Sequence, residues 1–131
     1  TWQILEGAHR IPITLFEAAA ALDAGDIYLQ RTIDLDGTEL VDEWRKLQLL
    51  TTISMCLEFC DCYTKVIEQS RPQQGKATSY RRRRPADSIL DPDRPISEHV
   101  DLLRVVDNKR YPAILKVRGQ QYKLQISRHN E

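Results

Sequence analysis

The sequence predicts an α/β fold, and three stretches carry this prediction. An apolar run, a turn and a second β-favouring run lie between Ile11 and Ile33, which is typical of strand, loop and strand. Helical periodicity with a wide apolar face follows from about Glu39 to Glu68. Near the C-terminus, alternating residues on both sides of Arg118-Gly119-Gln120 predict a β-hairpin. We therefore expect a long helix packed against a sheet, followed by a C-terminal β-hairpin.

Length and composition restrict the class of protein to which the chain can belong. The 131 residues are 41% apolar, which suits one small globular domain with a core. The formal net charge of zero argues against a general binder of nucleic acid or membrane surfaces. No apolar run approaches the ~20 residues that cross a bilayer, and no signal-peptide pattern is visible. Because the chain opens inside an expected helix and not at Met, we expect it to be part of a longer protein.

The first elements follow from local pattern. Trp2 to Glu6 is expected to be helical and to end at Gly7, because glycine takes the left-handed cap conformation at low cost. Ile13 to Phe16 and Ile27 to Ile33 are expected to be strands. His9 lies between the helix and the first strand, and we interpret it as an exposed loop residue.

The loop between these two strands holds the main candidate for chemistry. It reads Leu22-Asp23-Ala24-Gly25-Asp26. Aspartate accommodates turns, and Gly25 permits positive φ or a close approach of another backbone segment. A carboxylate in a loop at the mouth of a sheet suits catalysis, although local chemistry alone favours an ordinary turn with a supporting Asp.

The long helix is expected to begin after the turn at Asp36-Gly37, with Thr38 as N-cap, and to stop before Pro72 and Gly75. We expect its apolar side chains to pack in the core. They are Leu40, Trp44, Leu47, Ile53, Leu57, Phe59, Tyr63, Val66 and Ile67.

The cysteines fit neither a disulfide framework nor a metal centre. Cys56, Cys60 and Cys62 form an odd, clustered set, and the histidines are scattered. We expect buried free thiols in a reducing cytoplasm and no metal site.

Four consecutive arginines, Arg81 to Arg84, allow two interpretations. Guanidinium groups bind phosphate well, so the run is suited to an anion site. In isolation a solvated loop is favoured, in which some arginines pair with Asp87, Asp91 or Asp93.

The last part of the chain is expected to form a helix and the hairpin. Pro95 starts the helix, and Ile96, Val100, Leu103 and Val106 should share one face. His99 is expected at the surface of this helix.

Several of these segments resemble the 10-formyltetrahydrofolate-dependent formyltransferases. The run Leu22-Asp23-Ala24-Gly25-Asp26-Ile27 is similar to the Leu-Asp-x-Gly-(Asp)-Ile loop of that family. Residues 1–7 resemble the end of the helix before the first strand, and residues 102–106 and 111–113 resemble the later helix and proline segment. The resemblance implies the later half of a Rossmann-like formyltransferase domain. It places the catalytic domain over 1–108 and a β-hairpin extension, suited to homodimer contacts, over 109–131.

The resemblance also implies a mechanism and a set of site residues. The family transfers a formyl group from 10-formyltetrahydrofolate to an amine, using an Asn, a His and an Asp. Asp23 matches the catalytic Asp, and Ala20, Ala21, Leu22 and Asp23 are expected to line the pocket of the folate co-substrate. The Asn and His belong to a segment that would precede Thr1, so we expect residues 1–131 alone to be inactive.

The arginine run bears on the substrate. Residues 81–88 resemble the Arg-Arg-x-Pro-x-Asp-Ser run of amino-sugar N-formyltransferases. The implied partner is a nucleotide-linked amino sugar, and no membrane partner is expected. Methionyl-tRNA formyltransferase, with tRNA as partner, is the alternative. It would be expected to continue into a basic tRNA-binding domain, whereas this chain ends at Glu131. A non-catalytic interaction module, with Asp23 on a solvated turn and the arginines exposed, is a third hypothesis.

Overall fold

The computed structural model describes residues 1–21, 23–75 and 78–129. The chain forms two compact units, each built from segments that are distant in sequence. The loop unit comprises Arg10–Leu35 and Arg45–Ser79, and the terminal unit comprises Thr1–His9, Asp36–Trp44 and Tyr80–Glu131. Among the described residues, no helix is long and apolar enough to span a membrane.

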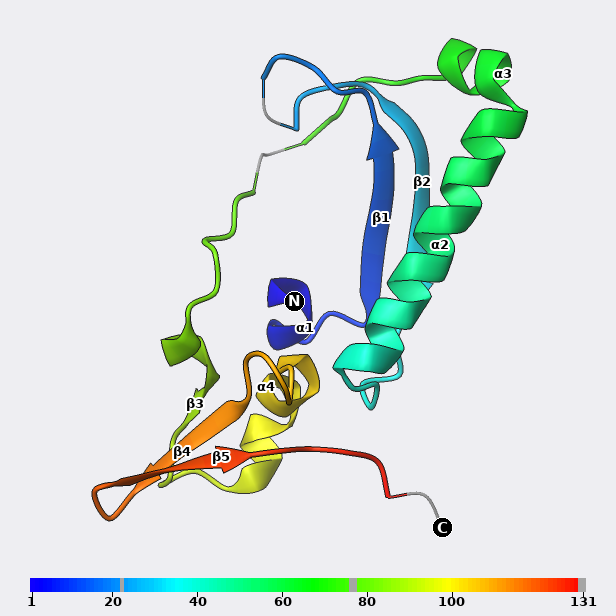
Figure 1. Ribbon diagram of the computed structural model, residues 1–131. Helices are drawn as coiled ribbons and strands as arrows, with labels where there is room; N and C mark the ends of the chain where they lie inside the picture. Colours follow the sequence, from blue (N-terminus) through cyan, green and yellow to red (C-terminus); the bar gives the residue numbers. More distant parts are fainter. Residues whose placement is uncertain (22, 76–77, 130–131) are drawn as a thin grey trace. The chain divides into compact units, whose positions relative to one another are not determined.

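The loop unit is built on an antiparallel strand pair with a long helix beside it (Figure 1). Strand β1 spans Arg10–Phe16 and β2 spans Ile27–Asp34, and Leu15 pairs with Leu29. The register shifts between Leu15 and Phe16, where the strands give way to the connecting loop. Both predicted strands are confirmed, each slightly longer than the sequence pattern indicated.

The predicted single helix is two helices in the structure. Helix α2 spans Val41–Asp61 and α3 spans Tyr63–Glu68, with Cys62 between them at φ −119° and ψ 28°, outside helical geometry. The prediction of Thr38 as N-cap is wrong, because the helix begins three residues later. There the Leu40 N–H donates to Glu43 Oε2 over 2.8 Å, so a side chain from inside the helix satisfies that amide.

Side chains of α2 and α3 pack on the strands through an aromatic cluster. Phe59 lies 5.4 Å from the Tyr28 ring and 5.3 Å from Tyr63, in an edge contact with the latter. An ion pair of 2.7 Å joins Arg31 to Glu58. The buried apolar side chains of this unit are Ile33, Leu35, Met55 and Val66.

The prediction that the apolar residues of the long helix all pack in the core is wrong for Leu47, Ile53, Leu57 and Tyr63, which are exposed. Trp44 and Val66 are buried as predicted. A strand pair covers only one side of a helix, so apolar residues spread around most of the helix cannot all be covered by it.

The cysteines also differ from expectation. Cys56, Cys60 and Cys62 are free thiols, as predicted, but all three are exposed. Cys56 lies on the side of α2 that faces β1, Cys60 lies further along α2, and Cys62 is the linker residue before α3.

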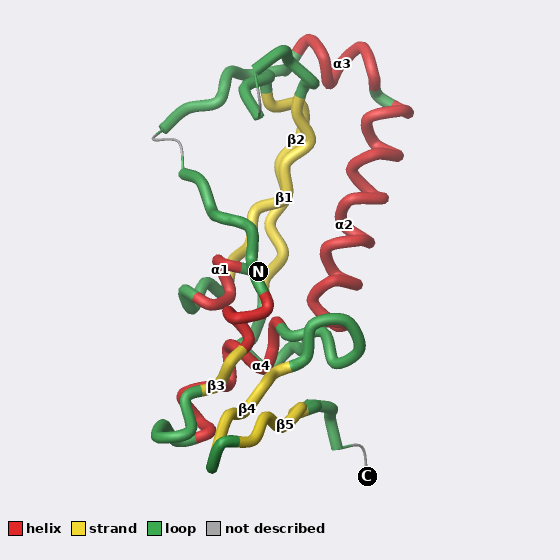
Figure 2. Tube along the Cα trace, turned by 60° about the vertical axis from the view of Figure 1, so that its left-hand side comes forward, coloured by secondary structure: helices red, strands yellow, loops and turns green. Residues whose placement is uncertain are grey.

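The terminal unit holds a three-stranded sheet in the order β3-β4-β5 (Figure 2). These strands span Ile89–Leu90, Ala113–Val117 and Gln120–Leu124, with β3 and β4 parallel and β4 and β5 antiparallel. Its core consists of Leu90, Leu103, Val106 and Ala113. The C-terminal hairpin is confirmed, and its turn residues Arg118 and Gly119 both have positive φ, as a two-residue hairpin turn requires.

Short helices complete the terminal unit. Helix α1 spans Trp2–Leu5 and packs against α4, Val100–Val105, and two 3₁₀ turns span Pro85–Ser88 and Ile96–His99. The predicted helix beginning near Pro95 therefore opens as a 3₁₀ turn, whose period of three residues breaks the expected apolar face. As a result Ile96 and Val100 are exposed, while Leu103 and Val106 are buried.

The surface position expected for His99 is wrong. His99 is buried, and its Nε2 lies 2.9 Å from the Asp91 carbonyl oxygen. The histidine thus holds the loop before its own 3₁₀ turn.

Candidate functional site

The connection between β1 and β2 presents Asp23 to solvent. Asp23 is exposed and has φ 51°, the left-handed conformation that aspartate adopts more readily than most residues. Ala20 and Ala21 precede it and are also exposed. The expected site residue Leu22 lies outside the described residues.

The base of this loop is closed by a very close backbone approach. The Glu17 N–H donates to the Asp26 carbonyl oxygen over 2.9 Å. A Cβ added at Gly25 would lie 2.0 Å from the Glu17 carbonyl oxygen, a distance that no side chain tolerates. The structure therefore confirms the sequence expectation that Gly25 permits a close backbone approach.

A segment far along the chain holds the loop from the other side. The Gln73 Nε2 group donates to the carbonyl oxygens of Asp23 and Gly25, both over 2.8 Å. Two residues earlier, Arg71 forms backbone hydrogen bonds with Ile27 of 2.7 and 3.1 Å. Gln73 and Arg71 carry no local signal of this role, because residues 69–76 show only the pattern of a helix end. Gln73 thus holds the backbone at Asp23, while the Asp23 side chain stays exposed.

The backbone of Ala20 and Ala21 is open to a ligand. Neither residue forms a backbone–backbone hydrogen bond with another described residue. Their exposed N–H and C=O groups are of the kind that can bind the edge of a planar heterocycle.

The start of β2 is an acidic environment. Partial burial raises the pKa of the Tyr28 phenol, and Glu17, Tyr63 and Asp26 raise it further.

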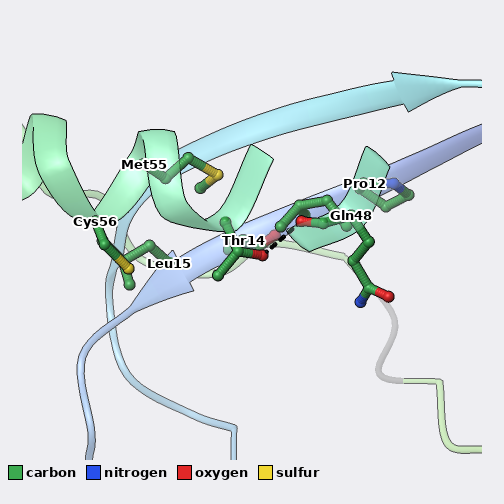
Figure 3. Close-up of a pocket in the computed structure, with 8 residues that line it drawn as sticks. Pro12, Thr14, Leu15, Gln48, Met55 and Cys56 are labelled. Atoms are coloured by element: carbon green, nitrogen blue, oxygen red, sulfur yellow. Dashed lines mark hydrogen bonds between the residues drawn. The ribbon is translucent and has the colours of Figure 1, made fainter. Parts of the chain in front are cut away.

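A pocket of about 300 Å³ lies between β1 and α2 in the same unit (Figure 3). Thr14 and Leu15 line it from the strand, and Met55 and Cys56 line it from the helix. Thr52 also lines the pocket, and its hydroxyl donates to the Gln48 carbonyl oxygen one turn earlier in α2 over 2.8 Å. No carboxylate or imidazole lines this pocket, so its described walls lack the groups that usually move protons.

In the terminal unit, alternate residues of the arginine run, Arg81 and Arg83, brace the loop that follows. Arg81 contacts the Asp87 carboxylate with both terminal nitrogens, over 2.7 and 2.5 Å. The Arg83 guanidinium donates to the Asp87 carbonyl oxygen over 2.9 Å and to Ser88 Oγ over 3.3 Å. The hydrogen bonds from Arg81 and from the Arg84 N–H hold the pKa of the Asp87 carboxyl far below its usual range. The expectation that some arginines brace the loop by pairing with Asp87 is confirmed.

The remaining two arginines point their charges to solvent. Arg82 and Arg84 are exposed, and neither forms an ion pair within the described ranges. Beside them, Trp2 and Tyr80 stack with ring centroids 6.2 Å apart, and the Arg81 guanidinium lies 4.9 Å from the Trp2 ring centre. We refer to Trp2, Tyr80 and the adjoining arginine run as the arginine–aromatic surface.

No group of histidine, cysteine or acidic side chains suited to a metal ion occurs in the part of the chain that the structure describes. The site candidates are therefore the Asp23 loop in one unit and the arginine–aromatic surface in the other.

Comparison with known proteins places this geometry on a known fold. No established family profile matches the sequence. A methionyl-tRNA formyltransferase from Clostridium thermocellum matches with a TM-score of 0.72 at 22% identity, over 98% of this chain and 55% of that one. A likely sugar N-formyltransferase from Mycobacterium tuberculosis matches with a TM-score of 0.70 at 14% identity, over 99% and 58%.

A 4-N formyltransferase from Francisella tularensis gives a TM-score of 0.70 at 16% identity, over 99% of this chain and 55% of that protein. The chain thus spans a little over half the length of these three structures. Their agreement confirms the predicted fold class: the chain has the mixed α/β fold of part of a formyltransferase domain, with the long helix and the C-terminal β-hairpin.

Proposed function

We propose that this chain is part of a cytoplasmic N-formyltransferase that transfers a formyl group from 10-formyltetrahydrofolate to the amine of a nucleotide-linked amino sugar. The observation that carries the proposal is the Asp23 loop. On a formyltransferase fold, Gly25 and Gln73 hold an exposed carboxylate in a defined backbone conformation. A catalytic group must be held in a fixed position, because misplacement of the reacting atoms lowers the reaction rate strongly.

Asp23 is the proposed catalytic carboxylate. The acceptor amine attacks the formyl carbon as a neutral nucleophile, and a proton must leave its nitrogen as the new bond forms. A carboxylate orients a neighbouring imidazole and stabilises the imidazolium formed during proton transfer. The imidazole and the amide that would stabilise the oxyanion are expected from a segment that has no match in residues 1–131, so we propose that these residues alone do not catalyse the reaction.

The folate co-substrate supplies the formyl group, and the loop residues before Asp23 are its proposed binding segment. Ala20 and Ala21 offer open backbone groups for the pterin edge. Leu22, outside the described residues, is proposed as an apolar contact on the strength of the sequence resemblance.

A sugar nucleotide fits the terminal unit better than tRNA does. Two unpaired guanidinium groups, Arg82 and Arg84, are suited to a pyrophosphate, and the aromatic pair Trp2–Tyr80 offers a surface for a base. Two of the three structures compared above carry names of sugar or 4-N formyltransferases. The methionyl-tRNA formyltransferase match favours the alternative substrate, methionyl-tRNA.

The test is formyl transfer by the full chain mixed with a polypeptide that carries the Asn- and His-containing half of a formyltransferase of this fold. We expect no turnover by the chain alone and measurable turnover by the mixture. Asp23→Asn should lower the rate of the mixture by at least about a hundredfold, the usual size of a proton-transfer contribution.

Asp34→Asn is the matched control, because Asp34 is an exposed carboxylate of the same unit, paired with Arg10 over 3.1 Å. This control should keep the rate within about twofold, since exposed ion pairs contribute little. Equal rates for Asp23→Asn and the parent mixture would reject Asp23 as catalytic. No turnover by the mixture would instead favour the interaction module, in which Asp23 only shapes a turn.

A further inference from the structure

The segment that follows α3 crosses the Asp23 loop within the same unit (Figure 1). We call residues 69–75 the strap. Its backbone pairs with the start of β2, where Arg71 and Ile27 exchange hydrogen bonds of 2.7 and 3.1 Å. The Arg71 guanidinium also donates to Gln30 Oε1 over 3.0 Å. The strap is therefore anchored to the strand pair two residues before it contacts the loop.

One side chain of the strap, Gln73, joins two carbonyl groups of the loop. Its Nε2 amino group has two N–H donors, and it lies 2.8 Å from the carbonyl oxygens of both Asp23 and Gly25. A single amide thus satisfies both acceptors at once. The two carbonyl groups lie on either side of Ala24, so the contact restricts the backbone torsions before and after that residue.

The backbone of the loop has few hydrogen bonds of its own to hold this conformation. Among the described residues of the stretch 18–25, none forms a backbone–backbone hydrogen bond, and the Glu17–Asp26 bond closes only the base. Asp23 has φ 51°, and a residue with a Cβ adopts this left-handed conformation at an energetic cost. Gln73 offsets that cost, because its hydrogen bonds form when the Asp23 carbonyl points towards the strap.

We propose that Gln73 is a positioning residue for formyl transfer, acting through Asp23 and not through contact with either substrate. The carbonyl carbon and the Cβ of Asp23 are bonded to the same Cα, so a fixed carbonyl restricts the direction in which the carboxylate points. A displacement of about 1 Å in a reacting geometry lowers the rate steeply. This role rests on the proposed function, because it requires that Asp23 takes part in catalysis.

The first test is steady-state kinetics of the mixture that tests the proposed function. Gln73→Ala should lower kcat at least about tenfold, because the carboxylate is no longer held in place. The KM values of both substrates should stay within about twofold, because Gln73 contacts neither of them. Gln73→Glu keeps the size of the side chain but removes both N–H donors, so it should lower kcat at least as much.

Gln74→Ala and Gln74→Glu are the matched controls. Gln74 is exposed, and within the described residues no hydrogen bond joins it to the loop. Gln74→Glu adds the same charge one residue further along the strap, so it separates the effect of charge from the loss of the donors. Both controls should keep the kcat of the parent mixture. An unchanged kcat for Gln73→Glu in an active mixture overturns the proposal.

A double-substitution cycle shows whether Gln73 acts through Asp23. In the Asp23→Asn background the carboxylate is already lost, so Gln73→Ala should lower kcat by less than about twofold more. Two full losses that multiply would give Gln73 a role apart from Asp23 and reject the positioning. A parent mixture without turnover would instead reject the proposed function, and the role of Gln73 with it.

The third test needs no catalysis. The backbone carbon chemical shifts of Asp23, measured by NMR in the full chain, report its conformation. We expect left-handed values in the parent and in Gln74→Ala, and a move towards extended values in Gln73→Ala. The shifts of Leu29 in β2 should stay unchanged, because the Arg71–Ile27 pair still anchors the strap. Left-handed values in Gln73→Ala would overturn the proposal, since the loop would then keep its conformation without this side chain.

Discussion

At the scale of single residues, the Asp23 loop shows which contacts a local pattern reveals and which it does not. The turn chemistry of Asp23 and the small size of Gly25 are visible in the sequence, so the need for a close approach at Gly25 was predictable. The role of Gln73 in holding the loop was not predictable, because its two hydrogen bonds reach residues about fifty positions earlier in the chain. A glutamine after a helix has no local signature of such a role.

Gly25→Ala should destabilise the chain more than a glycine substitution at a roomy turn. Its Cβ would lie 2.0 Å from the Glu17 carbonyl oxygen, so the loop must shift, at a cost of about 2–3 kcal/mol. Gly119→Ala is the control, because Gly119 has φ 75° and no atom within 4 Å of an added Cβ. It should cost about 1 kcal/mol, for backbone strain alone. Urea unfolding of both variants measures the difference, and equal losses would contradict the clash.

At the scale of elements, helix starts and helix faces were the weakest sequence predictions. Thr38 has good cap chemistry, but Glu43 supplies the hydrogen bond at the helix start instead. Leu47, Ile53, Leu57 and Tyr63 were correctly placed on a helix but not on its buried side. Periodicity identifies a helix, whereas burial depends on which elements pack against it.

The 3₁₀ turn at Pro85–Ser88 is the element whose stability should respond to acid. Arg81 and the Arg84 N–H lower the pKa of Asp87, so the ionised form is favoured in the folded state. This contribution is complete above the unfolded pKa of about 3.9. It is lost as pH falls below that value, towards the lower folded pKa.

Asp87→Asn should therefore reduce the difference in urea midpoint between pH 6 and pH 3. Asp93→Asn, on the next turn, is the control and should retain the difference seen in the parent. If Asp87→Asn and Asp93→Asn showed the same dependence on pH as the parent, the bidentate pair with Arg81 would not contribute to folding.

At the scale of the whole molecule, the sequence predicted the α/β class, both strands of the loop unit and the C-terminal hairpin. These elements depend on alternation and turn residues, which are local signals. The division of the chain into two units was not predicted, because each unit joins segments that are far apart in sequence. The free cations Arg82 and Arg84 could be distinguished from the bracing arginines only once the position of Asp87 was known.

The class of substrate is a property of the whole molecule, and it can be tested by substituting Arg82 and Arg84. In the complemented enzyme, Arg82→Ala/Arg84→Ala should raise KM for a nucleotide-linked amino sugar at least tenfold, because two phosphate contacts are lost. The KM for 10-formyltetrahydrofolate should stay unchanged. Arg94→Ala is the control, since Arg94 is an exposed arginine near Asp91 and Glu98. Activity on methionyl-tRNA, with none on amino-sugar nucleotides, would identify the alternative substrate.

The closed base of the Asp23 loop also sets where the chain tolerates insertions. Because the Glu17–Asp26 hydrogen bond and the Gly25 contact join the two ends, residues added next to Ala20 leave the strand pairing unchanged. One residue added within β2, after Ile27, would instead turn every later side chain of that strand to the opposite face. An insertion beside Ala20 should therefore preserve the strand pair, whereas the spacing from Gly25 to the end of β2 cannot change without altering the faces of the strand.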